Sequence, residues 1–202
     1  MNGHETEVKF YVRDLKMMES RLLELKARLI QPRIHEINFR YDLPDGSLRA
    51  NGCVLRLRHD TNAILTYKGP SSLIDGVFSR TELETTIGDL ETAQGILKAL
   101  GYVQILIYEK YRAIYEINEY RIMLDELPYG SFVEIEGSDA ANIRKMALHM
   151  GLDFESAVGA GYARIFENYK LKYGFPSNDL TFDAFHGKKP SPEELNMRAA
   201  DE

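Results

Sequence analysis

Charged side chains recur at every second residue in a series of short segments along this chain. In the first segment Glu5, Glu7 and Lys9 share one parity. The apolar residues Val8 and Phe10 have the other parity. Side chains of a β-strand point alternately to its two faces, so residues of one parity share a face. The pattern therefore predicts strands that are charged on one face and apolar on the other.

The same periodicity predicts a chain of many strands and few helices. Strands are expected near residues 4–12, 34–43, 53–60, 63–69, 77–88, 104–117, 119–127 and 131–137. Helices are expected over about 14–29, 89–100, 140–150 and 162–173, the first behind the N-cap residue Asp14 and two of them ending at Gly101 and Gly151. The tail from Gly174 is richer in Pro, Asp and Lys. We expect one domain over residues 1–173 and a partly flexible extension over residues 174–202.

The charged faces of the eight strands carry both signs in nearly equal number. The cations are Lys9, Arg56, Arg58, Lys68, Arg80, Lys110, Arg112 and Arg121, and the carboxylates are Glu5, Glu7, Glu82, Glu84, Asp125, Glu134 and Glu136. An ordinary sheet with one solvated face explains any single strand. It does not explain the matched pairs or the preference for Arg, which suits bidentate contacts to phosphate and carboxylate.

The expected helices are too few to cover both faces of an open sheet. Closing the sheet removes its edges and puts the charged face inside, with the apolar face outside under the helices. The predicted fold class is therefore α+β, a closed eight-stranded antiparallel β-barrel with a charged interior, or tunnel, and flanking helices.

A charged interior of this kind points to a ligand, because buried charges are costly unless they are paired, metal-bound or hydrated. Carboxylates are hard oxygen ligands for Mg²⁺ or Mn²⁺, and Arg and Lys donate to phosphate oxygens. A polyphosphate with about four negative charges, bridged by divalent cations, would use both sets of groups together.

Composition and charge exclude some classes of protein and indicate a cellular location. The net charge of −6 argues against a general nucleic-acid or membrane-surface binder, since such proteins usually carry a basic excess. The single cysteine, Cys53, cannot form an internal disulfide, which fits a reducing compartment. The sequence has no long apolar run, and its first nine residues are too polar for a signal peptide. Cytoplasm is the expected location.

Motifs along these strands are similar to those of the CYTH, or triphosphate tunnel metalloenzyme, superfamily. They occur in the family's order as Glu5-Thr6-Glu7-Val8-Lys9, Tyr41-Asp42, Leu55-Arg56-Leu57-Arg58, Thr66-Tyr67-Lys68-Gly69, Arg80-Thr81-Glu82-Leu83-Glu84, Glu109-Lys110-Tyr111-Arg112, Leu124-Asp125 and Val133-Glu134-Ile135-Glu136-Gly137. The first motif alone is weak, but the ordered series over roughly residues 4–170 is specific. The resemblance implies an eight-stranded antiparallel tunnel and a place among class IV adenylate cyclases, thiamine triphosphatases and inorganic triphosphatases.

The resemblance also implies roles for individual residues. The metal-binding carboxylates would be Glu5, Glu7, Glu134 and Glu136, with Glu82, Glu84 and Asp125 completing a second metal site or its water shell. The triphosphate would be held by Lys9, Arg56, Arg58, Lys68, Lys110 and Arg112. Tyr41 and Lys110 match the tyrosine and lysine that activate water in hydrolytic members. In the last expected helix Tyr162 is retained, but Arg164 replaces the acid that the family often carries.

The resemblance indicates the triphosphate substrate more directly than it indicates the reaction. Hydrolysis of an inorganic, nucleoside or thiamine triphosphate is favoured, because no local motif identifies the purine pocket that cyclisation would need. A class IV adenylate cyclase, forming cyclic AMP and pyrophosphate from ATP, is the alternative. A non-catalytic polyphosphate- or nucleotide-binding module is a third hypothesis. The expected partner is a triphosphate-containing small molecule bound together with Mg²⁺ or Mn²⁺. No nucleic-acid or membrane partner is expected. The sequence is compatible with a homodimer.

Overall fold

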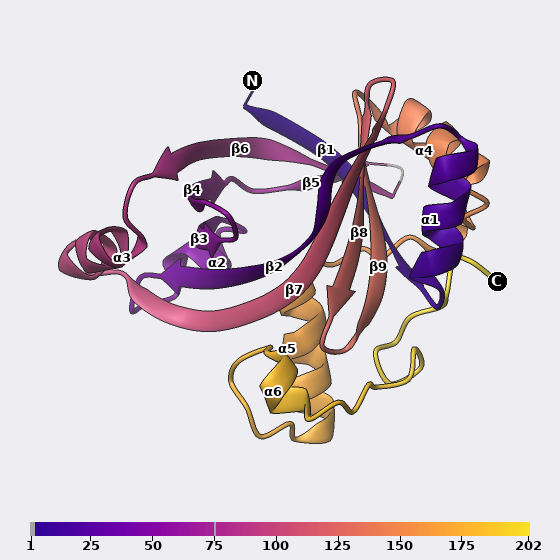
Figure 1. Ribbon diagram of the computed structural model, residues 1–202. Helices are drawn as coiled ribbons and strands as arrows, with labels where there is room; N and C mark the ends of the chain where they lie inside the picture. Colours follow the sequence, from indigo (N-terminus) through magenta and orange to yellow (C-terminus); the bar gives the residue numbers. More distant parts are fainter. Residues whose placement is uncertain (1–2, 75) are drawn as a thin grey trace.

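The computed structural model describes residues 3–74 and 76–202, and its centre is a ring of eight antiparallel strands (Figure 1). The strands are β1 (His4–Val12), β2 (Arg28–Asp42), β3 (Val54–His59), β4 (Ala63–Lys68), β6 (Val77–Ile87), β7 (Val103–Ile117), β8 (Tyr120–Leu127) and β9 (Gly130–Glu136). Their order is β1-β9-β8-β7-β2-β3-β4-β6, and β6 pairs back with β1 to close the ring. The short strand β5 (Ser72–Ile74) pairs with β6. The predicted closed antiparallel sheet with flanking helices is confirmed.

The apolar parity of the strands lies outside the ring, under the helices. Phe10, Ile122 and Ile135 are fully buried in a cluster with residues of α1 (Leu15–Glu24) and α4 (Ala140–His149). Leu22 of α1 is one of these residues and has no exposed surface. Burial of a side chain of this size stabilises the fold by about 1.5–3 kcal/mol, so this outer layer provides much of the core.

The first helix ends earlier, and the second strand begins earlier, than the sequence predicts. Helix α1 ends at Glu24 rather than near Leu29, because Lys26 adopts a left-handed backbone with φ of 60°. β2 then begins at Arg28 instead of residue 34. Pro32 has no N–H for the sheet, and the register between β2 and β7 shifts between Gln31 and Ile34. The predicted start at residue 34 therefore coincides with the residue at which β2 begins to pair regularly with β7.

The remaining helices include three short ones that the sequence analysis missed. The longer pair are α3 (Leu90–Ala99) and α5 (Tyr162–Tyr173), and the short ones are α2 (Ser47–Ala50), the 3₁₀ turn η1 (Phe154–Ser156) and α6 (Phe182–Phe185). The carboxylate of Asp42 accepts the N–H groups of Leu48 and Arg49, which fixes α2 at the end of β2. Among the described residues, no helix is long and apolar enough to cross a membrane.

The chain after α5 returns across the outside of the ring. Leu180 exchanges backbone hydrogen bonds with Ile107 and Glu109 of β7. Near the end of the chain the N–H of Ala200 donates to the carbonyl of Tyr11 in β1. Leu180, Phe185 and Ala200 are buried. The domain boundary at residue 174 and the partial flexibility of the tail stay predictions.

Candidate functional site

The ring encloses a cavity of about 1580 Å³. Most of the predicted site residues line it, namely Glu5, Glu7, Lys9, Arg56, Arg58, Lys68, Glu82, Glu84, Lys110, Arg112, Glu134 and Glu136. Arg80 and Arg121 line it too. The structure therefore brings residues from seven of the eight ring strands into one space, and they fall into three groups with different charge balance.

The first group is a paired cluster of six buried or nearly buried charges: Lys9, Glu36, Lys110, Arg112, Asp125 and Glu134. Arg112 donates to both oxygens of Asp125 at 2.6 and 2.5 Å and also contacts Glu134, which pairs with Lys9. Lys110 lies 3.1 Å from Asp125 and 3.5 Å from Glu36. The three cations and three carboxylates balance one another within the group.

Tyr162 closes this cluster from the first turn of α5. Its hydroxyl donates to Asp125 at 2.8 Å, and the ammonium of Lys9 lies 4.2 Å from the centre of its ring. Burial and the Asp125 carboxylate raise the pKa of Tyr162 well above its usual value. Burial would raise the pKa of Glu134 as well, but the charges of Lys9 and Arg112 hold it well below its usual range. The cluster is charged and internally paired, although the buried Oε2 of Glu36 makes an ion pair with Lys110 and no hydrogen bond to any described residue.

The second group is a carboxylate mouth formed by Glu5, Glu7, Glu82 and Glu136, with Lys68 and Arg80 between them. Lys68 lies 2.8 Å from Glu5 and 3.0 Å from Glu82. Arg80 lies 3.1 Å from Glu5 and 3.5 Å from Glu7. Arg121 on β8 is the cross-strand partner of Glu136, so three cations face four carboxylates and the mouth keeps a small excess of negative charge.

Burial and neighbouring charges shift the pKa values of three carboxylates in the mouth. Burial raises the pKa of Glu82 to about 7, with Lys68 opposing and Glu5 adding to the shift. Burial and the charge of Glu5 also raise the pKa of Glu136. For Glu5, burial is outweighed by Lys68 and Arg80, and its pKa falls to about 2. Within residues 3–74 and 76–202 no three His, Cys, Asp or Glu side chains are gathered closely enough to hold a metal ion.

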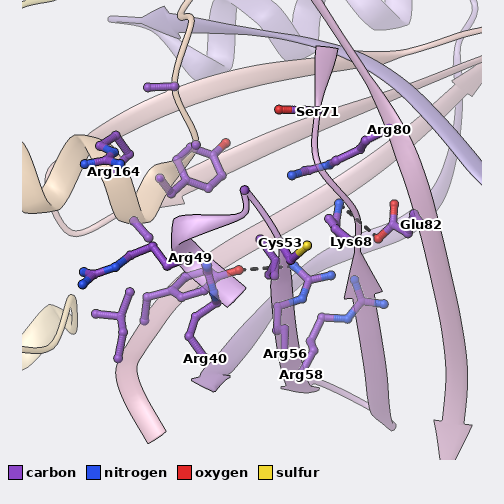
Figure 2. Close-up of a pocket in the computed structure, with 18 of the residues that line it drawn as sticks. Arg40, Arg49, Cys53, Arg56, Arg58, Lys68, Ser71, Arg80, Glu82 and Arg164 are labelled. Carbon is purple, nitrogen blue, oxygen red and sulfur yellow. Dashed lines mark hydrogen bonds and ion pairs between the residues drawn. The ribbon is translucent and has the colours of Figure 1, made fainter. Parts of the chain in front are cut away.

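The third group is an arginine wall formed by Arg40 on β2 and by Arg56 and Arg58 on β3 (Figure 2). Arg40 and Arg56 are direct cross-strand partners. Two carboxylates lie within ion-pair distance of this wall, Glu84 at 3.4 Å from Arg56 and Asp60 at 3.3 Å from Arg58, while Asp42 acts on Arg40 and Glu36 on Arg56 at longer range. The buried Nε atoms of Arg40, Arg56 and Arg58 have no hydrogen-bond partner among the described residues. The wall carries an excess of positive charge.

Four tunnel residues near this wall were missed by the sequence analysis. They are Glu36, Asn38 and Arg40 on β2 and Tyr108 on β7. The parity of the predicted strand 34–43 could have found the first three, and the parity that Tyr108 shares with Lys110 in the predicted strand 104–117 could have found the fourth. Arg56 donates to the hydroxyl of Tyr108 at 3.2 Å. Burial would raise the pKa of Tyr108, but the charges of Arg56 and Lys110 lower it.

The predicted pairing of Tyr41 with Lys110 is wrong. Tyr41 has the parity opposite to Arg40 and packs outside the ring with Leu57 and with Leu97 of α3. Lys110 lies inside, in the paired cluster. A register shift between Arg40 and Tyr41 in the β2–β7 pairing does not return Tyr41 to the cavity. Asp125 lies behind the cavity lining, beneath Lys110 and Arg112.

Comparisons with known proteins agree with this fold. The sequence model of the CYTH domain matches residues 3–144. A protein of Methanocaldococcus jannaschii, provisionally named an adenylate cyclase, is 31% identical over 137 residues, which are 66% of this chain and 77% of that protein. The adenylate cyclase CyaB of Aeromonas hydrophila is 29% identical over 135 residues, covering 65% of this chain and 67% of its own. A solved Vibrio parahaemolyticus structure, described provisionally as an adenylate cyclase, has a TM-score of 0.75 at 22% identity and covers 83% of this chain and 99% of its own.

Proposed function

The chain belongs to the CYTH domain family, and from this premise we propose that it is a divalent-metal-dependent enzyme acting on a triphosphate in its tunnel. The observation that carries the proposal is the separation of charge within one cavity. The carboxylate mouth has more acids than bases, and the arginine wall has more bases than acids. A phosphate chain that carries a divalent cation complements both surfaces at once.

The residues of the carboxylate mouth suit a divalent cation by their donor chemistry, but no three of them are placed closely enough to hold one, so binding would require them to move together. Glu5, Glu7, Glu82 and Glu136 are hard oxygen donors on β1, β6 and β9. Burial, with a smaller contribution from the charge of Glu5, raises the pKa values of Glu82 and Glu136, and a bound cation would favour their charged forms. Lys68 and Arg80 would have to yield Glu5 to the cation. A bound Mg²⁺ or Mn²⁺ would stabilise charge on the phosphate oxygens. The other expected ligands, Glu84, Asp125 and Glu134, stay predictions, and the last two are neutralised by cations here.

Cyclisation of ATP is the reaction that we propose first. In that reaction the ribose 3′-oxygen bonds to the α-phosphorus, the bond from that phosphorus to the departing pyrophosphate breaks, and the hydroxyl proton is lost to solvent. Two curated relatives carry the name of an adenylate cyclase. The cavity of about 1580 Å³ also exceeds the usual 300–1,000 Å³ or so of small-ligand pockets, so it has room for a nucleoside as well as its phosphates.

Hydrolysis is the second candidate, and Tyr108 favours it. The outward position of Tyr41 removes the tyrosine first expected to act on water. Tyr108 lies inside the tunnel instead, two residues before Lys110 on the same face of β7, and its pKa is lowered. A tyrosine with a lowered pKa can accept a proton from a water that attacks the terminal phosphorus.

One assay tests the proposal and separates the two reactions. The purified protein is incubated with Mg²⁺ or Mn²⁺ and with ATP, inorganic triphosphate or thiamine triphosphate in parallel. Cyclic AMP with pyrophosphate identifies the cyclase, and orthophosphate identifies the hydrolase. Tyr108→Phe should lower kcat by about 10²–10⁴ only in the hydrolase, because general-base assistance is of that size. Binding without turnover of any substrate, or full activity in excess EDTA, would defeat the proposal.

A further inference from the structure

One half of β7 takes its second backbone partner from the C-terminal extension, residues 174–202. β7 pairs with β2 from Val103 to Glu116, but it pairs with β8 only from Tyr111 to Ile117. Before Tyr111, no strand within residues 3–74 and 76–202 pairs with that other edge of β7. Leu180 of the extension forms a single parallel bridge there, opposite Tyr108. An unpaired strand edge leaves N–H and C=O groups without partners, so the bridge stabilises an otherwise open edge.

Four hydrogen bonds fasten the extension to β7, and we call them the β7 clamp. The N–H of Leu180 donates to the carbonyl of Ile107, and the N–H of Glu109 donates to the carbonyl of Leu180, both at 2.9 Å. The N–H of Ile107 also donates to the carboxylate of Asp179 at 2.7 Å. The N–H of Phe182 donates to the carboxylate of Glu109 at 3.0 Å. The clamp therefore holds the β7 residues on both sides of position 108.

Tyr108 lies between the two clamped residues and faces the tunnel. Successive side chains of a strand point to opposite faces, so its neighbours Ile107 and Glu109 have the opposite parity. The Tyr108 side chain lines the cavity and is buried, and its hydroxyl accepts a hydrogen bond from Arg56 at 3.2 Å. Tyr108 and Leu180 also belong to one buried apolar cluster. A shift of the clamped backbone would therefore move the Tyr108 hydroxyl relative to Arg56.

We propose that the C-terminal extension is a positioning segment, in which Asp179 and Leu180 hold β7 so that the Tyr108 hydroxyl meets Arg56 inside the tunnel. This inference rests on the proposed function, because it takes the tunnel as the site of reaction. The CYTH sequence model matches residues 3–144, so the extension half of the clamp lies outside the matched region. Displacing a tunnel group by about 1 Å can change a rate by up to about 10²-fold.

Ultraviolet titration of tyrosinate tests the position of Tyr108 without any ligand. Each protein is compared with the same protein carrying Tyr108→Phe, so that the difference reports Tyr108 alone. Burial would raise the pKa of Tyr108, but the charges of Arg56, Lys110 and Arg40 lower it. In Glu109→Ala/Asp179→Ala, which removes both carboxylate acceptors of the clamp, the ionisation of Tyr108 should move to higher pH because its hydroxyl leaves Arg56. Loss of two negative charges alone would move it to lower pH, so the sign separates the two effects.

The matched control is Glu109→Gln/Asp179→Asn, which loses the same two charges but keeps an oxygen acceptor at each position. In this variant Tyr108 should ionise at or below the wild-type pH. Asp179→Ala alone, which removes one of the four bonds, should give a smaller upward shift and serves if the double alanine variant does not fold. An unchanged or downward shift in the alanine variants, or the same upward shift in the control, would overturn the proposal.

Turnover gives a second, independent measurement. Glu109→Ala/Asp179→Ala should lower kcat by no more than Tyr108→Phe does, and it should lower kcat no further in a protein that already carries Tyr108→Phe, because the clamp acts through that hydroxyl. A further loss in the Tyr108→Phe background would show that the extension acts by another route. If wild type turns over no triphosphate, the proposed function fails while the titration still tests the clamp. If wild type is active and Tyr108 ionises unchanged in the alanine variants, only this inference fails.

Discussion

The paired cluster and the arginine wall lie in the same tunnel, but they treat buried charge in opposite ways. In the paired cluster every cation meets a carboxylate, as Arg112 meets both Asp125 and Glu134. In the arginine wall Arg40 faces Arg56 across the strands, and three buried Nε atoms make no hydrogen bond to any described residue. Buried charge is stable when it is paired and hydrogen-bonded, and it is costly otherwise.

This difference indicates separate roles for the two regions, structural support for the paired cluster and anion binding for the arginine wall. Each cation of the paired cluster already meets a carboxylate, so we expect the cluster to hold the ring in shape and to orient Tyr162. The arginine wall has more cations than carboxylates in ion-pair contact, so we expect it to contribute binding free energy for an anion at the expense of stability. Substitutions in the paired cluster should therefore change stability more than anion binding. Substitutions in the arginine wall should change anion binding more than stability.

The largest effect is expected from breaking the paired cluster. Asp125→Asn removes the charge that Lys110, Arg112 and Tyr162 share, and it leaves two buried cations short of a partner. We expect a loss of about 3–5 kcal/mol in the free energy of unfolding, measured by urea denaturation. Glu155→Gln, which removes one partner of the exposed pair with Arg144, should cost less than about 1 kcal/mol. Equal stability of Asp125→Asn and wild type would show that the cluster does not support the fold.

A smaller effect, on binding rather than on folding, is expected from the arginine wall. Arg58→Ala should weaken binding of Mg²⁺-triphosphate by about 1.5–3 kcal/mol, because one charge-assisted hydrogen bond to phosphate is lost. It should raise KM more than it lowers kcat, since the contact is made before and during reaction. Arg28→Ala, at an exposed pair with Glu116, is the control of equal charge. A variant with normal affinity for triphosphate would remove Arg58 from the site.

The smallest effect is expected at the carboxylate mouth and depends on pH. The pKa of Glu82 is raised to about 7, above its ordinary value of 4.5. Without metal, the stability linked to Glu82 is therefore fully present below pH 4.5 and is lost as the pH rises through about 7. Mg²⁺ needs the carboxylate, so its affinity should rise up to about ten-fold per pH unit below pH 7 and level off above. Magnesium titrations should show this slope in wild type and a flatter one in Glu82→Gln, and a flat wild-type profile would contradict the assignment.

Strand parity was sufficient to predict the tunnel and most of its lining. Residues such as Glu7 and Glu134 show their orientation directly, because they alternate with Val8 and Val133. Parity does not reveal which charges pair. Lys9 meets Glu134 because β1 pairs with β9, strands 125 residues apart in sequence at this contact. The division into a paired cluster and an arginine wall could not be predicted without that register.

The error at Tyr41 has the same physical origin. Its motif resembled that of the family, but parity along β2 places Arg40 inside and Tyr41 outside under α3. Applying parity to the predicted strand 34–43 would have found Arg40 and Asn38 and rejected Tyr41. The pKa of Tyr108 could not have been predicted, because it depends on Arg56, a neighbour that only the folded ring supplies.

The most direct test of the division is thermal unfolding of the double variant Arg40→Gln/Arg56→Gln, with and without Mg²⁺ and inorganic triphosphate. Wild type should melt at a higher temperature when the anion is present, since a ligand at about 100 times its Kd adds about 2.7 kcal/mol of stability. Without the anion the double variant should melt close to the wild-type temperature, because relief of the repulsion between Arg40 and Arg56 offsets the lost contacts of Arg56 with Tyr108 and Glu84. Its melting temperature should shift little when the anion is added. A lower melting temperature without the anion, together with a full shift on adding it, would contradict the assignment of the arginine wall to phosphate.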